Sequence, residues 1–221
     1  RVVKNGAGTL ILAGANTYAG TTTVNAGTAL VNNTSGSGTG SGNVTVNSGG
    51  TLGGTGSISG TVTVNPGGTA APGLSPGTLS TGNLALTPGS TLSAEIVSAS
   101  QYDTLNVTGT VNLGGATLSV ADPAYGLAYG EDWVLVQNDG ADAVTGTFAG
   151  LPEGAPVRVG GVLVGVITYQ GGDGNDVALQ GYLAPSLNGV SITSPVNENG
   201  TATLSGNIAG PDPQAPLTLV V

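Results

Sequence analysis

The fold of this chain is decided by a short motif that returns along its first half. The stretch Val24–Leu30, VNAGTAL, recurs as Val46–Leu52, VNSGGTL, and as Val64–Ala70, VNPGGTA. A looser copy is Leu86–Leu92, LTPGSTL, and a degraded fifth copy is Leu113–Leu118, LGGATL. The leading apolar residue moves from position 24 to 46, 64 and 86, so the steps are 22, 18 and 22 residues. Self-similarity at a nearly fixed period indicates a repeat architecture.

Each period contains short runs of alternating side chains, such as Thr22–Val24, Val44–Val46 and Val62–Val64, bounded by Gly, Asn or Pro. This is the pattern of strands and tight turns, and apolar spacing typical of helices is almost absent. A coil of about 20 residues with two or three short strands predicts an all-β fold, a parallel β-helix. Successive coils would lie about 4.8 Å apart, so eight or nine of them would form a rod of roughly 40 Å.

Stacked coils place equivalent residues in columns, which predicts two features of the interior and the turns. The leading apolar residues should form an inward aliphatic column of Val24, Val46, Val64 and Leu86. The asparagines that follow them, Asn25, Asn47 and Asn65, should form a second column at a turn. Asn tolerates turn conformations and can bond to neighbouring amides, so we assign these residues a structural role.

Composition limits both the core and the partners. The chain has 221 residues, of which 41 are Gly, with one Trp, one Phe and no Cys or His. Since large aromatic residues are scarce, the core must be narrow and filled by short aliphatic side chains. The balance of 12 Asp and Glu against 3 Lys and Arg excludes nucleic acid as an expected partner. It also argues against binding to anionic lipid, and no apolar run is long enough for direct membrane insertion.

Several blocks resemble one known family. Asn5–Leu30 looks like the passenger-associated repeat of bacterial autotransporter passenger domains, and Ala71–Leu79, Tyr102–Gly109 and Tyr169–Leu179 add to the likeness. The resemblance covers about residues 4–180. It implies a right-handed parallel β-helix stalk that is exported and displayed outside the bacterial cell.

Changes in composition predict three regions. Residues 1–120 form the regular coils, and residues 121–183, which are more apolar and acidic, form irregular final coils and a cap. A cap is expected because the last coil exposes both the core and strand edges. Residues 184–221 resemble the opening strands of an immunoglobulin- or cadherin-like repeat of large bacterial surface proteins, or act as a strand-donating extension. Both ends of the chain look cut, so we expect a piece of a longer polypeptide.

One stretch matches a catalytic motif. The sequence GLSPG around Ser75 fits G-x-S-x-G, the turn that presents a serine nucleophile in α/β-hydrolases. However, the chain has no His to act as general base, and Lys4 is the only lysine. The residue after Ser75 is Pro76, which has no backbone N–H to offer an oxyanion. We therefore predict that Ser75 lies in a structural turn and that the chain has no catalytic residue.

A second match concerns calcium. Residues 171–179, GGDGNDVAL, fit the calcium-binding nonapeptide G-G-x-G-x-D-x-U-x. In that architecture the ion sits between successive copies, whereas this chain has one copy, with Ala178 at the position of the large apolar residue. The expectation is no cofactor, with calcium near Asp173 and Asp176 as the alternative to a polar turn.

The remaining acids and aromatic residues suggest a weaker carbohydrate hypothesis. The acids cluster in sequence: Asp122, Glu131, Asp132, Asp139 and Asp142. Glycosidases need two carboxylates beside a sugar, and the aromatic platform would come from Tyr125, Tyr129 and Trp133. A polysaccharide lyase would need a base, for which Arg158 is the only candidate in this half. The preferred interpretation is solvated acids on a cap, and an enzyme would lose its turnover on Asp132→Asn.

The function expected from these observations is structural and non-catalytic. The chain would be a stiff β-helix stalk of an extracellular bacterial surface or filament protein. Its partners would be other copies, through end-to-end contacts or strand donation. The alternative is an adhesin that binds a glycan or a cell surface through an exposed aromatic patch within Tyr125–Trp133 in the cap loops.

Overall fold

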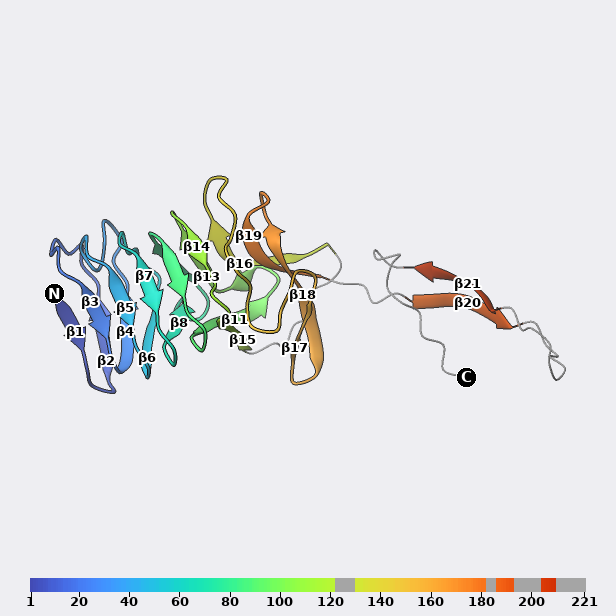
Figure 1. The fold of residues 1–221 in the computed structure, drawn as a ribbon, viewed down its shortest axis with the longest axis horizontal. Helices are drawn as coiled ribbons and strands as arrows, with labels where there is room; N and C mark the ends of the chain where they lie inside the picture. Colours follow the sequence, from blue (N-terminus) through green and yellow to red (C-terminus); the bar gives the residue numbers. More distant parts are fainter. Residues whose placement is uncertain (122–129, 182–185, 193–203, 210–221) are drawn as a thin grey trace. The chain divides into compact units, whose positions relative to one another are not determined.

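The computed structural model describes residues 1–121, 130–181, 186–192 and 204–209. It divides into two compact units, residues 1–181 and residues 182–221. No helix occurs in the described ranges, so the described part of the first unit is built from strands and turns. Figure 1 shows its coils stacked side by side from the N-terminus towards β15. The division into regions 1–120, 121–183 and 184–221 remains a prediction.

The first side of the stack is a sheet of six parallel strands, one from each successive coil. Its strands pair in the order β1 (Val2–Lys4), β3 (Thr22–Val24), β5 (Val44–Val46), β7 (Val62–Val64), β10 (Leu84–Leu86) and β14 (Val111–Asn112). The register keeps like residues together, since Val24 pairs with Val46 and Val46 with Val64. The repeat seen in the sequence is therefore the stacking period.

The second side is also a parallel sheet across the same coils. Its strands are β2 (Thr9–Leu12), β4 (Gly27–Val31), β6 (Gly50–Gly54), β8 (Thr69–Pro72), β11 (Thr91–Ser98) and β15 (Thr117–Ala121). At its end β11 turns back on itself through the short antiparallel strand β12 (Gln101–Tyr102). This hairpin is the first departure from the repeat.

The third side changes character along the stack. In the early coils it consists of extended segments joined by bonds such as Gly38 N–H to Ser57 O at 2.8 Å. It becomes a parallel sheet with β9 (Thr78–Thr81), β13 (Thr104–Val107) and β16 (Asp132–Asn138). Beyond β16 the pairing turns antiparallel through β19 (Asp176–Gln180), β18 (Val162–Gly171) and β17 (Pro156–Val159). We call β17, β18 and β19 the cap.

These sheets form a parallel β-solenoid of about five turns with a spacing of about 22 residues, which confirms the predicted fold class. The eight or nine coils expected from the length are too many. The reason is the antiparallel cap, because its long strands use residues that would otherwise have formed further coils. The spacing is also uneven, because paired residues of neighbouring parallel strands lie 18 positions apart in β5 and β7 but 31 apart in β13 and β16.

The interior is an aliphatic column, as the repeat predicts. Val24, Val46 and Val64 are 0% exposed, and Leu86 is 2% exposed. The intervening Thr residues of β3, β5 and β7 are only half-buried, because alternate side chains of a strand point to opposite faces. Each coil thus contributes one Val or Leu to the core at every equivalent position.

The predicted asparagine column is a continuous hydrogen-bonded ladder that begins one coil earlier than expected. Asn25 Nδ2 donates to Asn5 Oδ1 at 2.8 Å. Asn47 Nδ2 donates to Asn25 Oδ1, and Asn65 Nδ2 donates to Asn47 Oδ1, each at 2.7 Å. In the next coil Thr87 Oγ1 donates to Val64 O instead, at 2.9 Å. The ladder satisfies amide groups at a turn and holds the coils in register.

Tight turns beside the ladder require glycine. Gly27 has φ of +69°, and a Cβ built on it would lie 2.4 Å from Gly6 O in the preceding coil. A side chain there would strain the backbone and also push neighbouring coils apart. The glycine of the repeat therefore permits the close approach of successive turns.

Asn47→Asp is expected to destabilise the stack by about 1–3 kcal/mol at neutral pH. The substitution keeps the acceptor for Asn65 but replaces the donor to Asn25 with a second oxygen, so two oxygens face each other. Urea unfolding followed by circular dichroism measures the loss. Asn5→Asp is the matched control, because Asn5 acts in the ladder through its acceptor, and we expect its effect to be small. Equal losses for the two variants would contradict this account.

The second unit contains an antiparallel pair of strands, β20 (Ser186–Ile192) and β21 (Leu204–Ala209). Their register shifts between Asn188 and Ser191, which marks a bulge or irregularity. The immunoglobulin- or cadherin-like interpretation of residues 184–221 stays a prediction.

Candidate functional site

The serine of the hydrolase-like motif lies in a loop between β8 and β9. Ser75 has φ of +69°, a left-handed conformation that is unusual for a residue with a side chain. The loop is held at its start by reciprocal backbone bonds between Gly54 and Gly73, at 3.2 and 2.9 Å. Gly77 closes it by accepting a bond from Thr104 N at 3.0 Å. The strained serine thus belongs to a turn fixed on both sides by backbone pairing.

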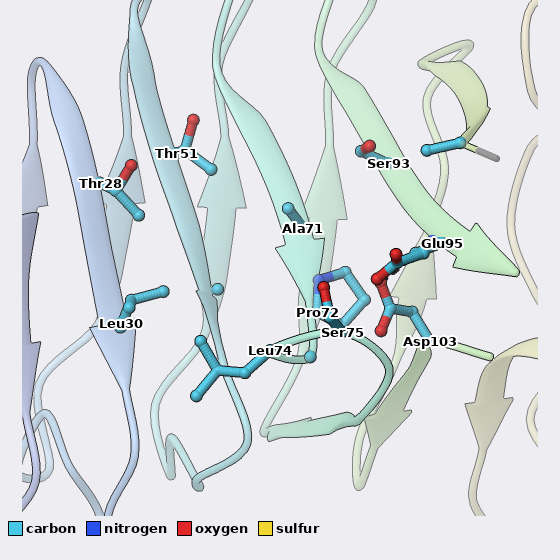
Figure 2. A pocket seen from close by; sticks show the side chains of 13 residues that line it. Thr28, Leu30, Thr51, Ala71, Pro72, Leu74, Ser75, Ser93, Glu95 and Asp103 are labelled. Atoms are coloured by element: carbon cyan, nitrogen blue, oxygen red, sulfur yellow. Dashed lines mark hydrogen bonds between the residues drawn. The ribbon is translucent and has the colours of Figure 1, made fainter. Parts of the chain in front are cut away.

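This loop borders a shallow groove of about 340 Å³ on the outer face of the second sheet. Figure 2 shows its floor, where Thr28, Thr51 and Ser93 come from three different strands and run across the coils. Leu74 overhangs one side and is half exposed, and Glu95 and Asp103 lie next to each other at one end. The groove combines hydroxyl groups, small apolar surface and two carboxylates.

Asp103 anchors the loop. Its Oδ1 accepts the Gly77 N–H at 2.9 Å, and its Oδ2 accepts the Glu95 N–H at 3.0 Å. A Cβ on Gly73 would lie 2.0 Å from Oδ1, so only glycine fits beside this carboxylate. Burial raises the pKa of Asp103, the two backbone N–H groups lower it, and the charge of Glu95 raises it further. These contacts explain Asp103 as a loop anchor. Lys4, the only lysine that could act as a base for Ser75, lies on β1 in the first coil, away from Ser75.

The raised pKa of Asp103 predicts how stability depends on pH. Because the folded state holds the proton more tightly than the unfolded chain, this residue stabilises the fold most at low pH. That contribution is lost as the pH rises from the ordinary value of 3.8 through the folded pKa. The difference in unfolding free energy between the wild type and Asp103→Asn, measured between about pH 3 and 7, should therefore change with pH, because only the wild type loses this contribution as the pH rises. A difference that is constant with pH would contradict the assignment.

The calcium-type motif takes a different form from the one its sequence suggests. Residues 172–175 form the turn of the antiparallel hairpin between β18 and β19, with Gly171 pairing with Asp176. The nonapeptide architecture instead needs parallel stacked turns. Asp176 is 5% exposed and its Oδ1 accepts the Asn138 N–H at 2.8 Å. Ala178, in the position of the large apolar residue, is fully buried.

Asp173 and Asp176 line a pocket of about 370 Å³ together with residues of other strands. The pocket lies where Asn138 ends β16 and where Thr104 begins β13. Burial raises the pKa of Asp176, the Asn138 N–H lowers it, and the charge of Asp173 raises it. The pocket therefore places two negative groups close together on the cap.

The carbohydrate hypothesis fares worse. Trp133 is 0% exposed and its Nε1 donates to Ser98 O at 3.1 Å, so its predicted place in an exposed aromatic patch is wrong. Its ring lies in the core, where it fills the end of the last parallel coil next to the cap. Of the acids, Asp132, Asp139 and Asp142 are exposed, and Glu131 is half-buried. Asp122, Tyr125 and Tyr129 lie outside the described residues.

The basic residue proposed for a lyase lies beside a turn of the cap. Arg158 is exposed on β17, and its Nη1 donates to the backbone oxygen of Gly161 at 3.2 Å. That bond closes the turn between β17 and β18. Within the described ranges no group of three acidic side chains gathers at one point as metal ligands would.

Sequence reasoning missed two buried asparagines beside the cap pocket. Asn138 is 2% and Asn175 7% exposed, and neither side-chain oxygen has a hydrogen-bond partner. Their amide nitrogens are occupied, with Asn138 Nδ2 donating to Asp142 O at 2.7 Å and Asn175 Nδ2 donating to the same atom at 3.1 Å. No sequence pattern links residues that lie 38 positions apart, as Asn138 and Asp176 do.

Comparison with known families identifies the first part of the stack. Residues 2–28 match the passenger-associated-transport-repeat. The match runs from β1 through β3 to the start of β4, so it covers the first full coil and the turn into the next. No curated protein matches the chain. Among the described residues no helix is long and apolar enough to cross a membrane.

Together the repeat and the β-solenoid fit the passenger part of an autotransporter. The resemblance to bacterial passenger domains that the sequence suggests is therefore supported for the β-helix. This repeat family also suggests a secreted or surface location in a bacterium.

Proposed function

We propose that the chain is a non-catalytic stalk that is exported and displayed on a bacterial surface or in a filament. The observation that carries the proposal is the passenger-associated-transport-repeat match in a stack of parallel coils. Continuous backbone ladders along two sides resist bending and stretching, because each coil is bonded there to its neighbours. Buried aliphatic residues at equivalent positions also pack against one another from each coil to the next.

Display on cells tests this proposal. The full chain, with an epitope tag before Arg1, is fused to an autotransporter translocation unit and expressed in a Gram-negative host. We expect antibody to bind the tag on intact cells and the coils to resist external protease. The matched pair Val46→Asp and Thr45→Asp separates folding from charge, since only Val46 faces the core. Retention of the wild-type chain inside the cell would overturn the proposal.

The stalk and the enzyme alternative make opposite predictions. A stalk should show no turnover on a panel of polysaccharides, and Asp132→Asn should behave as the wild type. Ser75 has neither a histidine partner in the sequence nor a following backbone N–H. Turnover that Asp132→Asn abolishes would replace the stalk by a carbohydrate-active enzyme.

Self-association is a further part of the proposal. The two parallel sheets begin with β1 and β2, which pair on one side with β3 and β4. Val3 is 41% and Ile11 58% exposed on these strands. A second copy that adds its own strand here would extend the ladders, as in end-to-end or strand-donating assembly. Sedimentation velocity over a wide concentration range should show oligomers that Val3→Lys reduces, whereas a monomer throughout would contradict this part.

The adhesin alternative has less support after the burial of Trp133. The cap-loop residues Tyr125 and Tyr129 lie outside the described residues, and among the described ones the groove of Figure 2 offers a different surface, in which half-exposed Leu74 overhangs a hydroxyl-bearing floor. Binding to a glycan array that Leu74→Asp abolishes would favour it over a purely mechanical stalk.

A further inference from the structure

The hairpin of β17 and β18 ends in a tip that pairs with no further strand among the described residues. Strand β19 pairs with β18 from Val166 onward, so the residues of β18 before Val166 pair with β17 alone. The tip turns through Gly160 and Gly161, whose φ angles of +57° and +86° are those of a two-residue hairpin loop. Figure 1 shows this hairpin projecting from the cap. Because a two-stranded ribbon is only marginally stable by itself, a surface that packs against the tip would stabilise it.

The tip exposes one apolar and one basic side chain. Val162 is 57% exposed, and Arg158 is exposed as well. Arg158 Nη1 donates to Gly161 O at 3.2 Å, and its guanidinium makes no further hydrogen bond or ion pair within the described ranges. Arg158 is also the only basic residue that follows Lys4 in a chain of net charge −9. The tip therefore combines an apolar contact with an isolated positive charge.

The groove of Figure 2 has the complementary features. Leu74 forms one side of it and is 50% exposed. Glu95 and Asp103 lie at one end, and none of the lining residues is Lys or Arg. Asp103 accepts backbone N–H groups with both of its oxygens, whereas the Glu95 carboxylate has no hydrogen bond or ion pair in the described part of the chain. The Glu95 carboxylate is therefore available to a positive charge from outside.

The two surfaces also agree in size. The groove crosses five neighbouring strands of the second sheet, from Leu30 on β4 to Ala121 on β15. Neighbouring strands lie about 4.8 Å apart, so the groove spans roughly 19 Å. The hairpin tip, residues 158–163, is about 10 Å long and two strands wide. It can therefore lie in the groove, over the low part of the floor at Gly53 and Ala71.

We propose that the groove binds the β17–β18 hairpin tip of a second copy of this chain, so that Val162 of one copy packs against Leu74 of the other. The Arg158 guanidinium then lies beside the Glu95 carboxylate, where it can form charge-assisted hydrogen bonds. Groove and tip are different surfaces, so each bound pair of copies keeps one free groove and one free tip. Such a contact builds a ring or a filament. The inference rests on the proposed function for self-association alone, and it uses a surface separate from the edges of β1 and β2.

Disulfide cross-linking tests the contact, because the chain has no Cys of its own. Leu74→Cys and Val162→Cys are made as separate full-length variants, mixed in equal amounts and oxidised. We expect the cross-linked heterodimer to exceed both homodimers, since a disulfide forms only where the two Cβ atoms approach to about 4 Å. Ile11→Cys, at a position that is 58% exposed, is the matched control for Val162→Cys. Equal cross-linking of Leu74→Cys to either partner would overturn the proposal.

Exchange of the two charges tests the polar half of the contact. Arg158→Glu and Glu95→Arg each place like charges together, so each should weaken association in sedimentation velocity at least about tenfold. The double variant restores opposite charges and should associate within about threefold of the wild type. Circular dichroism in urea checks that each variant is folded. A double variant as weak as the single ones would refute the pairing of Arg158 with Glu95.

The contact and the proposed function fail in different experiments. Display on cells measures export of the tagged chain and does not depend on Arg158, whereas Val3→Lys acts on the edge at β1. A chain that is displayed, but stays monomeric and gives no cross-link between positions 74 and 162, would refute the contact alone. That result would leave the groove to the glycan of the adhesin alternative.

Discussion

Replacing Val46 with Asp is expected to unfold the coils around β5 while the later coils and the cap stay folded. Val46 is 0% exposed and stacks between Val24 and Val64 in the aliphatic column. A carboxylate there has no partner and must either stay charged in an apolar interior or bind a proton. Either route costs about 4 kcal/mol or more, which is at the extreme of single substitutions.

The damage should remain local because of how the stack is built. Each coil contacts mainly its neighbours, so stability is approximately a sum over coils and over the interfaces between them. Loss of one coil removes two interfaces, whereas coils beyond them keep their own contacts. Limited proteolysis should therefore release the N-terminal coils and leave a resistant fragment that contains β10 to β19.

Thr45→Asp is the matched control for this experiment. Thr45 is the neighbour of Val46 on β5, and its side chain points outward. An added charge at that position remains solvated, so we expect unfolding close to that of the wild type. The measurement combines circular dichroism in urea with mass spectrometry of the protected fragment. Loss of the whole fold in one step for Val46→Asp would contradict the picture of independent coils.

The regular coils were predictable from the sequence because the repeat states its own geometry. Val24, Val46 and Val64 share both a position in the repeat and a place in the core, so one rule describes them all. The ladder of Asn25, Asn47 and Asn65 follows from the same rule. Its extension to Asn5 was missed, since that residue lies outside the quoted motif.

The cap was less predictable because no repeat constrains it. Strand β16 pairs in parallel with β13 on one side and antiparallel with β19 on the other. The prediction that Trp133 belongs to an exposed aromatic patch is wrong for this reason. Trp133 lies outside the repeat, so the repeat gave no sign that its side chain fills the end of the core.

The candidate sites were likewise predictable only where a local sequence motif marked them. The sequence argues against a catalytic role for Ser75, through Pro76 and the absence of His, and this stays a prediction. The anchoring of that turn by Asp103 was not foreseen, because it depends on a hairpin that interrupts the repeat. Asp173 and Asp176 were singled out by their motif, but Asn138 enters their pocket only through the pairing of β16 with the cap.

Trp133→Ala is expected to open the cap and to destabilise the end of the solenoid by about 3–5 kcal/mol. Trp133 is fully buried, pairs with Leu179 across β16 and β19, and donates from Nε1 to Ser98 O at 3.1 Å. The substitution removes the largest buried side chain and leaves the Ser98 carbonyl without that donor. The fully buried core of the parallel coils is aliphatic, with Leu and Ile as its largest side chains, so the space left by the indole stays unfilled.

Trp133→Phe separates packing from hydrogen bonding at this position. It keeps most of the apolar volume and loses only the Nε1 donor, so we expect a loss of about 1–2 kcal/mol. Circular dichroism in urea is the appropriate measurement, since both variants lack the single tryptophan of the chain. Protease should cut Trp133→Ala first within residues 130–181, because the parallel coils before β16 keep their own ladders. If Ala and Phe at position 133 were equally stable, the cap would not depend on the indole, and the end of the solenoid would be closed by the antiparallel strands alone.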